Sequence, residues 1–247
     1  AFDVLEQSLI AIRKELLEVP RAVLMVSSHW EERGFAVSSS ATPGMVYDYS
    51  GFPEHTYHIR YAAPGAPDVA ARVKELLDAG GLGARLDPER GYDHGTFSIM
   101  KPMYPEEAMP IVQLSIDPGY DPELHLQLGR LLAPLRDEGV LIIGSGLSYH
   151  NLAELRGGGR AVEASRAFDA WLQETVVGST PEDRTAGLIA WEQAPMARAA
   201  HPREDHLIPL MTVVGAAEED AAATVYHQSD LFGGVTASSF RLGALPQ

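Results

Sequence analysis

Histidine side chains provide the clearest chemistry in this sequence. Nine histidines are present and cysteine is absent, so a disulfide, a thiolate metal site and a cysteine nucleophile are all excluded. Any bound metal must therefore be held by histidine, aspartate or glutamate. Histidines on separate segments suit a borderline divalent ion such as Fe(II), Zn or Mn. Their spacing leaves two chemistries open: oxygen activation at a metal with free positions, and hydrolysis by a zinc-bound water.

Two of these histidines directly follow predicted buried strands. His29 comes after the apolar run 21–27, and His150 stands in a glycine-containing loop after the apolar run 139–145. In open α/β sheets ligands bind beyond the carboxyl ends of the strands, so their positions make both residues candidates. The alternative interpretation is a polar strand end for His29 and, for His150, a loop whose glycines serve only the turn. The loop lacks the lysine of a phosphate-binding loop, which argues against nucleotide binding.

Three further histidines have settings that suggest a role. His201 and His206 stand at the start of a helix predicted over 202–216, five residues and so about 140° apart, which argues against their binding the same ion. One of them is expected to coordinate while the other caps or orients. His94 has a carboxylate before it and a glycine after it, a setting that suits proton transfer, although a turn histidine bonded to the backbone is an equally good interpretation. The remaining histidines are expected to be surface or packing residues: His55, His58, His125 and His227.

The elements that must position these residues alternate between strands and helices. Residues 224–240 alternate in polarity and are expected to add one or two edge strands. Apolar strands that alternate with helices predict an α/β fold, a single domain with a central, mostly parallel or mixed β-sheet flanked by helices on both faces. The buried strands are predicted at 21–27, 110–116 and 139–145, and the helices at 2–19, 65–79, 122–137, 160–177, 181–191 and 202–216.

The length and charge of the chain fit one domain over residues 1–247 that binds a small molecule. Acidic residues outnumber basic ones, 34 to 19, for a formal net charge of −15, which opposes binding to nucleic acid or to an anionic membrane. No apolar run approaches the roughly 20 residues that span a bilayer, and no signal peptide opens the chain. We therefore expect a cytoplasmic protein, and a homodimer as the commonest kind of oligomer.

Short motifs run through nearly the whole chain in one order. They are S-S-H-W at 27–30, Y-D-Y-S-G-F-P at 47–53, Y-A-A-P-G at 61–65, D-H-G at 93–95, M-Y-P at 103–105, P-I-V-Q-L-S at 110–115, G-S-G at 144–146 leading to His150 and Asn151, and H-P at 201–202 leading to His206 and L-I-P-L at 207–210. Together they resemble the DOPA 4,5-dioxygenase family, which belongs with the B subunits of protocatechuate 4,5-dioxygenase among the class III extradiol dioxygenases. The resemblance implies a single catalytic α/β domain with a metal in a pocket above the sheet.

The resemblance also implies roles for four histidines. His29 and His206 match metal ligands of the family. His150 matches a histidine at the metal site that serves as a ligand or as an acid and base, depending on the branch. His94 matches a histidine near the pocket, which implies proton transfer or support of the site.

The ligand set departs from the family in one place. In the broader group a glutamate supplies the third ligand, which makes Glu204 and Asp205 lesser candidates. The family has a further metal-binding histidine in an H-G-S-P element before the first helix, and nothing in this sequence matches it. We therefore expect that an N-terminal metal-binding segment of the natural protein is missing from these residues.

The resemblance implies an extradiol ring-cleavage dioxygenase that opens a DOPA-like catechol with O2 through a histidine-bound Fe(II), with zinc as the alternative metal. His150 and His94 are expected to transfer protons, while Trp30, Tyr49 and Phe52 either line the pocket or pack in the core. Two other functions would use the same residues. A zinc-dependent hydrolase would turn over esters or amides without oxygen uptake, and a non-enzymatic binding protein like the Memo-like members of the superfamily would consume no oxygen.

Overall fold

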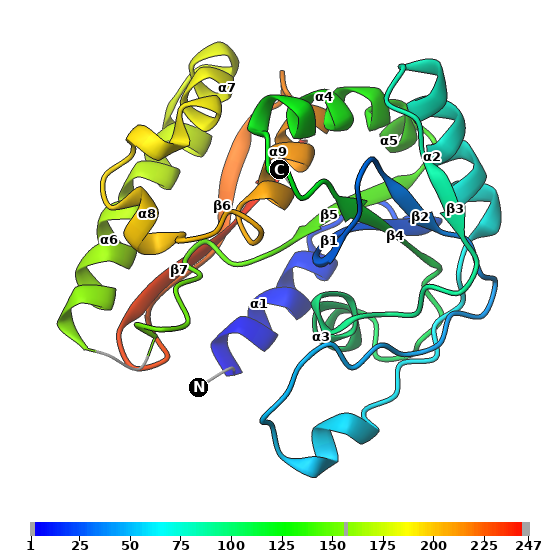
Figure 1. Ribbon diagram of the computed structural model, residues 1–247, viewed down its shortest axis with the longest axis horizontal. Coiled ribbons are helices and arrows are strands. Elements are labelled where there is room, and N and C mark those ends of the chain that lie inside the picture. The colour runs from blue at the N-terminus through cyan, green and yellow to red at the C-terminus, as the bar shows by residue number, and fades with distance from the viewer. Residues whose placement is uncertain (1–2, 156–157, 244–247) are drawn as a thin grey trace.

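The computed structural model describes residues 3–155 and 158–243, and its centre is a mixed sheet (Figure 1). The five strands are β1 (Ala22–Glu31), β2 (Ala36–Ser38), β3 (Arg85–Asp87), β4 (Ile111–Ile116) and β5 (Val140–Ser145), in the order β3-β2-β4-β1-β5. β1 pairs in parallel with β4 on one side and with β5 on the other, while β2 pairs antiparallel with β4. The predicted α/β fold is confirmed.

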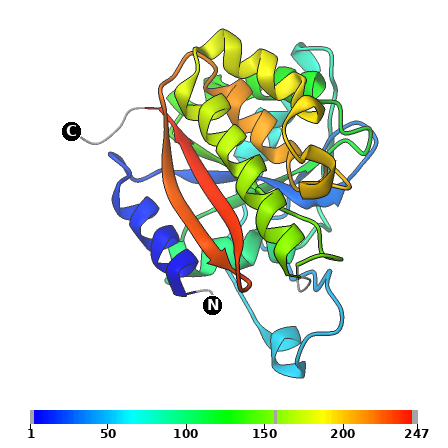
Figure 2. The ribbon, with the colours of Figure 1, turned by 90° about the vertical axis from the view of Figure 1, so that its left-hand side faces the viewer.

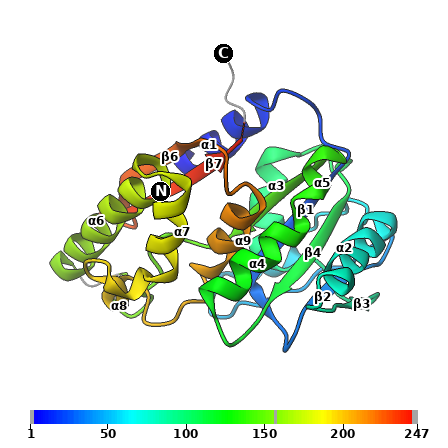
Figure 3. The same ribbon diagram turned by 90° about the horizontal axis from the view of Figure 1, so that it is seen from above.

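Helices cover both faces of this sheet. Along β1, Leu24 and Val26 join the apolar cluster formed with one layer of helices, whereas Val23 and Met25 join the cluster on the opposite face. Because both faces are buried, these strands are apolar at nearly every position. Figure 1 shows α2 (Pro67–Ala79), α4 (Pro122–Leu132), α5 (Pro134–Asp137) and α9 (Ile208–Ala216) on one face, and α1 (Asp3–Lys14) and α3 (His94–Met103) on the other. Figure 3 shows α4 and α9 packed side by side.

Most of the chain after β5 forms a group of helices and strands beside the sheet. It contains α6 (Gly159–Gln173), α7 (Pro181–Ile189), α8 (Ala197–Ala200), β6 (Ala222–Leu231) and β7 (Val235–Leu242). β6 and β7 form an antiparallel hairpin that lies between α1 and α6 (Figure 2). The strands expected at 224–240 therefore exist, but they do not extend the central sheet, because their buried side chains pack on these helices. None of the described helices is long and apolar enough to cross a membrane.

Four helices end earlier than predicted. The helix expected over 2–19 ends at Lys14, and the one expected over 181–191 ends at Ile189. The helix expected over 122–137 is interrupted at Ala133, because Pro134 has no backbone N–H to continue the hydrogen-bonding pattern and starts a new turn instead. The helix expected over 160–177 changes at Glu174–Gly178 into a π-helical turn. Both changes lie outside the edge of the sheet where the candidate histidines gather.

The segment before α9 is the difference that affects the site. We expected Pro202 to open a helix over 202–216, but α9 begins at Ile208. The proline in the first turn of the helix is Pro209, where a missing N–H is tolerated. His206 consequently lies in an irregular turn and not on a helix, so the helical angle that we expected between it and the preceding histidine does not apply.

Candidate metal and catalytic centre

His29 lies near the end of β1, where the pairing of that strand becomes irregular. β1 continues to Glu31, so His29 belongs to the strand and does not follow it as predicted. The register with β4 shifts between Val26 and Glu31, and such bulges redirect side chains beside active sites. The backbone N–H of His29 donates to Ser27 Oγ, and its side chain is partly buried. The central strand thus holds an imidazole at the carboxyl edge of the sheet.

α3 begins directly beside β1, and its first residue is His94. The buried Asp93 caps the first turn of the helix and also accepts a hydrogen bond from Ser27 Oγ, which ties the helix start to the strand. A Cβ at Gly95 would lie 2.8 Å from Cδ2 of His29, so only glycine permits this approach. The rings of His29 and His94 consequently lie close together, with centroids 3.8 Å apart.

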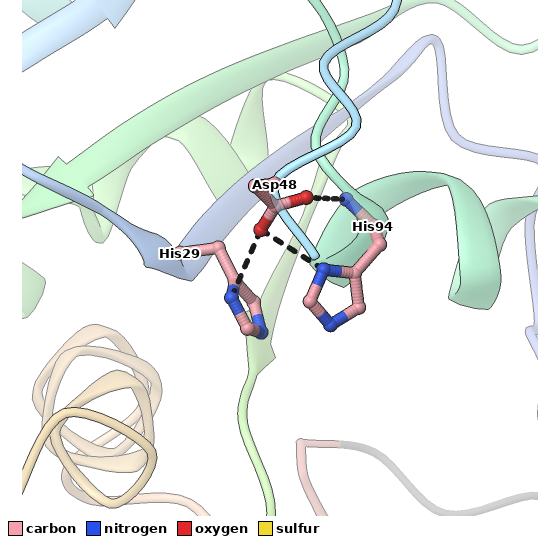
Figure 4. Close-up of side chains that lie close together, drawn as sticks. All are labelled: His29, Asp48 and His94. Carbon is pink, nitrogen blue, oxygen red and sulfur yellow. Dashed lines mark hydrogen bonds and ion pairs between the residues drawn. The ribbon is translucent and has the colours of Figure 1, made fainter. Parts of the chain in front are cut away.

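Asp48 joins these two histidines, as Figure 4 shows. Its Oδ2 lies 3.0 Å from Nδ1 of His29 and 2.9 Å from Nδ1 of His94, and its Oδ1 accepts from the backbone N–H of His94 at 2.9 Å. Burial would raise the pKa of Asp48, but the hydrogen bonds from His29 and His94 outweigh it and hold that pKa well below its usual value. The charged carboxylate is therefore an acceptor toward both rings.

His206 and His150 form a second cluster with Asp205. Asp205 Oδ2 lies 3.0 Å from Nδ1 of His206, and its Oδ1 lies 4.0 Å from Nδ1 of His150. The two rings are stacked with centroids 3.3 Å apart. Burial, reinforced by the neighbouring His206, lowers the pKa of His150 to about 3, and burial lowers the pKa of His206 although Asp205 opposes this. Both rings are thus neutral at neutral pH, the form that binds metals.

Backbone contacts between two loops hold the second cluster together. The N–H of Leu147 donates to the carbonyl of His206, and the N–H of His150 donates to the carbonyl of Ala200. Gly146 permits this approach, because a Cβ there would lie 2.1 Å from the same His206 oxygen. The loop after β5 and the turn before α9 are therefore paired, and this pairing holds one ring against the other.

The two clusters meet at the Nε2 atoms of His29 and His206, which are 3.2 Å apart. Each ring has a carboxylate oxygen about 3.0 Å from its Nδ1, from Asp48 in one case and Asp205 in the other. At 3.2 Å the two Nε2 atoms repel each other unless a proton or a cation lies between them. Metal–nitrogen bonds of about 2.1 Å join nitrogens up to about 4.2 Å apart, so one ion could contact both atoms. Carboxylates commonly hold the far nitrogen of metal-binding histidines, and this donor set fits a divalent metal.

His201 and Glu204 lie outside both clusters. His201 is buried, and its Nε2 donates to the backbone carbonyl of Ser148, in the loop that leads to the stacked rings. Glu204 is paired with Arg198 at 2.7 Å. Of the two histidines in this segment, His206 faces the site, and His201 supports the loop beside it.

Asp48 is a site residue that the sequence analysis did not single out. It lies in the motif at 47–53, so its place within the family resemblance was the available signal. Its role depends on a contact between distant segments, because an isolated bridge pairs Met45 with Tyr92, two residues before His94. Local sequence patterns do not reveal such a pairing. The structure also brings Asp205, expected only as a lesser candidate, to the second cluster.

The aromatic residues expected near the site differ in position. Tyr49 contacts the ring of His94 edge-on, with centroids 5.3 Å apart. Trp30 is buried beneath the guanidinium group of Arg90, and Phe52 is 59% exposed. Tyr49 is therefore the one of these three that touches a ring of the site.

The four other histidines lie away from both clusters. His125 is buried, and its Nε2 accepts from the backbone N–H of Asp117. His55 and His58 are exposed, and His227 is half-exposed.

A mixed α/β sheet with histidine rings and carboxylates gathered at the carboxyl ends of β1 and β5 defines a metal-dependent enzyme. The chain belongs to the LigB family, because residues 1–243 match the family of the catalytic LigB subunit of aromatic ring-opening dioxygenase. It is an extradiol ring-cleavage dioxygenase, and the predicted family is confirmed.

Similar proteins agree with this assignment over most of the chain. A 4,5-DOPA dioxygenase extradiol of Portulaca grandiflora is 37% identical over 228 residues, which cover 90% of this chain and 82% of the relative. The protein of that name from Beta vulgaris is 39% identical and covers 85% and 78% respectively. A crystal structure of an uncharacterized Escherichia coli K12 protein superposes with a TM-score of 0.77 at 30% identity, covering 96% of this chain and 92% of that one.

Proposed function

We propose that this enzyme opens the ring of a DOPA-like catechol with O2, using Fe(II) held by His29, His206 and His150. The observation that carries the proposal is the pair of Nε2 atoms 3.2 Å apart, each on a ring whose Nδ1 faces a carboxylate. When bound, the iron supplies one centre at which catechol and O2 meet. The names of the relatives, 4,5-DOPA dioxygenase extradiol, support a catechol of this kind.

His94 is the proposed acid and base on one side of the centre. Asp48 accepts a hydrogen bond from Nδ1 of His94. Nε2 is therefore the atom that takes a proton from a catechol hydroxyl and returns it as the ring opens. The Tyr49 ring lies beside the His94 ring, perpendicular to it, with centroids 5.3 Å apart. The product is a ring-opened semialdehyde acid.

His150 flanks the centre on the opposite side. Its ring is neutral because burial lowers its pKa to about 3, so it either contributes a lone pair to the metal or accepts a proton. The stacking against His206 fixes the plane of the ring. Substitution distinguishes the two roles, since losing a ligand lowers metal content whereas losing a base lowers turnover alone.

The test is anaerobic Fe(II) loading followed by oxygen uptake with a panel of catechols. We expect uptake together with a yellow ring-opened product, and little uptake from the same protein loaded with zinc. The variants His94→Gln and His150→Gln should lower turnover by about 100-fold or more if each transfers a proton. Iron-loaded protein that consumes no oxygen with any catechol would overturn the proposal.

A further inference from the structure

A single carboxylate serves two histidines of the centre. We propose that Asp48 is a positioning residue that fixes the proton of both His29 and His94 on Nδ1, and thereby presents both Nε2 atoms to metal and substrate. The roles of the two Nε2 atoms rest on the proposed function. The tautomers themselves do not depend on it.

Three nitrogen atoms lie within hydrogen-bonding distance of the Asp48 carboxylate. Its Oδ2 faces the Nδ1 atoms of both rings at 3.0 and 2.9 Å, and its Oδ1 takes the backbone N–H of His94 at 2.9 Å (Figure 4). A carboxylate has enough lone pairs for all three and offers no proton in return. The hydrogen on each ring must therefore lie on the nitrogen that faces Asp48.

The chain delivers this carboxylate by a long-range pairing. The N–H of Tyr92 donates to the carbonyl of Gly44, and the N–H of Val46 donates to the carbonyl of Tyr92. Asp48 follows two residues after Val46, and His94 follows two residues after Tyr92. The segment before Asp48 is thus aligned with the start of α3.

In the second cluster a carboxylate also lies between two histidine rings, but it approaches only one of them closely. Asp205 approaches Nδ1 of His206 at 3.0 Å but stays 4.0 Å from Nδ1 of His150. Within the described part of the chain, these are the two groups in which histidines and a carboxylate gather closely enough to share an ion. Asp48 alone of the two carboxylates lies within hydrogen-bonding distance of both of its rings.

An amide cannot replace this carboxylate. If the side-chain oxygen in an Asp48→Asn variant accepted the backbone N–H of His94, the new NH2 group would face both ring Nδ1 atoms and require them to be acceptors. The ring protons would then move to Nε2 and remove the lone pairs needed there. If the amide were reversed, two N–H groups would oppose each other at the backbone of His94.

The experiment compares the full chain with its Asp48→Asn variant in the absence and presence of zinc. Long-range proton–nitrogen correlation spectra of the zinc-free proteins report which nitrogen of each ring is protonated. Competition with a chromophoric chelator gives the zinc affinity. We expect the wild type to have Nδ1–H on His29 and His94, and the variant to gain Nε2–H on at least one of them. Zinc affinity should fall by about 10- to 100-fold.

Asp183→Asn is the matched control, because Asp183 is an exposed carboxylate that contacts Thr180 at the start of α7, far along the chain from the site residues. It should leave zinc affinity and the imidazole spectra unchanged. If Asp48→Asn keeps both ring tautomers and a zinc affinity within about twofold of the wild type, the inference is overturned, whatever happens to melting temperature. Failure of the iron-loaded wild type to consume oxygen would overturn the proposed function and leave this result intact.

Discussion

The histidines of the centre differ in where their rings lie, and that difference is the basis of the roles proposed for them. The Nε2 atoms of His29 and His206 face each other at 3.2 Å, so both lie close to one position that an ion could take. His94 and His150 lie on the outer sides of this pair, against His29 and His206 respectively. This arrangement agrees with the proposal that the inner pair holds an ion and that His94 exchanges protons with a bound catechol, while His150 is placed for either role.

Replacing His206 should remove metal binding together with activity. In the His206→Ala variant one of the two facing nitrogens is lost, and the stacking partner of His150 is lost with it. We expect zinc or iron content measured by elemental analysis to fall below about one tenth of the wild-type value, a loss at the upper end of that seen for perturbed metal sites.

The control for this prediction is His55→Ala, because His55 is exposed on the short helix at Glu54–His58. That variant should bind metal and turn over substrate like the wild type. A His206→Ala protein that retains full metal stoichiometry would contradict the ligand role.

At the scale of elements, the site depends on how closely α3 approaches β1. The start of the helix fits beside the strand because residue 95 has no side chain, and a Cβ there would also lie 3.1 Å from the hydroxyl oxygens of Ser27 and Ser145. Gly95→Ala should therefore displace either the His29 ring or the helix. We expect a loss of about 1–3 kcal/mol in the free energy of unfolding, as in other overpacked positions, and weaker zinc binding.

Denaturant unfolding and zinc competition measure the two effects of Gly95→Ala. Gly159→Ala in α6 is the matched control, since a Cβ there meets no atom within 4 Å. Equal stability and equal zinc affinity for the two glycine variants would show that the contact with His29 does not constrain the site.

The sequence pattern predicted most of the long elements but missed α3, a ten-residue helix with Pro102 inside it. The apolar runs that became β1 and β4 are buried on both faces, and β5 packs partly buried side chains on both, which is why composition alone revealed them. β2 and β3 have three residues each, too few for a periodic pattern. The start of α9 was misplaced because two prolines could open the helix, and local rules do not choose between Pro202 and Pro209.

Some residues of the candidate site could be predicted from the sequence, and others could not. His29 and His150 belong to or follow strands whose carboxyl ends meet in space, so strand position alone brought them to the same edge of the sheet. Asp48 lies in no predicted element, and the pairing of its segment with Tyr92 joins residues far apart in sequence. The place of Asp48 at the site could be found only from the three-dimensional structure, because long-range contacts and not its neighbours in the chain determine its partners.

At the scale of the whole molecule, buried neutral histidines link stability to pH. Burial lowers the pKa of His125, and burial lowers the pKa of His201 to about 4. In the unfolded chain histidine has a pKa of about 6.5, so below that pH the unfolded state binds more protons. The contribution of these neutral histidines to the free energy of unfolding should be fully present above about pH 6.5 and should be lost as the pH drops toward about 4.

Urea unfolding of metal-free protein between about pH 8 and about pH 5 measures this dependence. The His125→Gln variant should be less stable than the wild type at neutral pH, because the bond from the Asp117 N–H is disturbed, but its stability should fall less steeply on acidification. Parallel curves for the two proteins would contradict the assignment of a lowered pKa to His125.

The chain has 34 acidic and 19 basic residues, and the resulting negative charge acts over the whole surface. It favours small-molecule substrates over nucleic acid. The homodimer and the cytoplasmic location stay predictions from base rates and composition.

His29 and His206 are separated by 177 positions along the chain, and this distance has a consequence for biosynthesis. A ribosome that has released the chain only as far as α4 has made His29, Asp48 and His94 but not the facing nitrogen of His206. In the proposed site, an ion can be held between His29 and His206 only after the turn before α9 has emerged and closed. Because an ion that binds only the native arrangement stabilises it by mass action, a metal in this proposed site would stabilise the fold after its central sheet has formed.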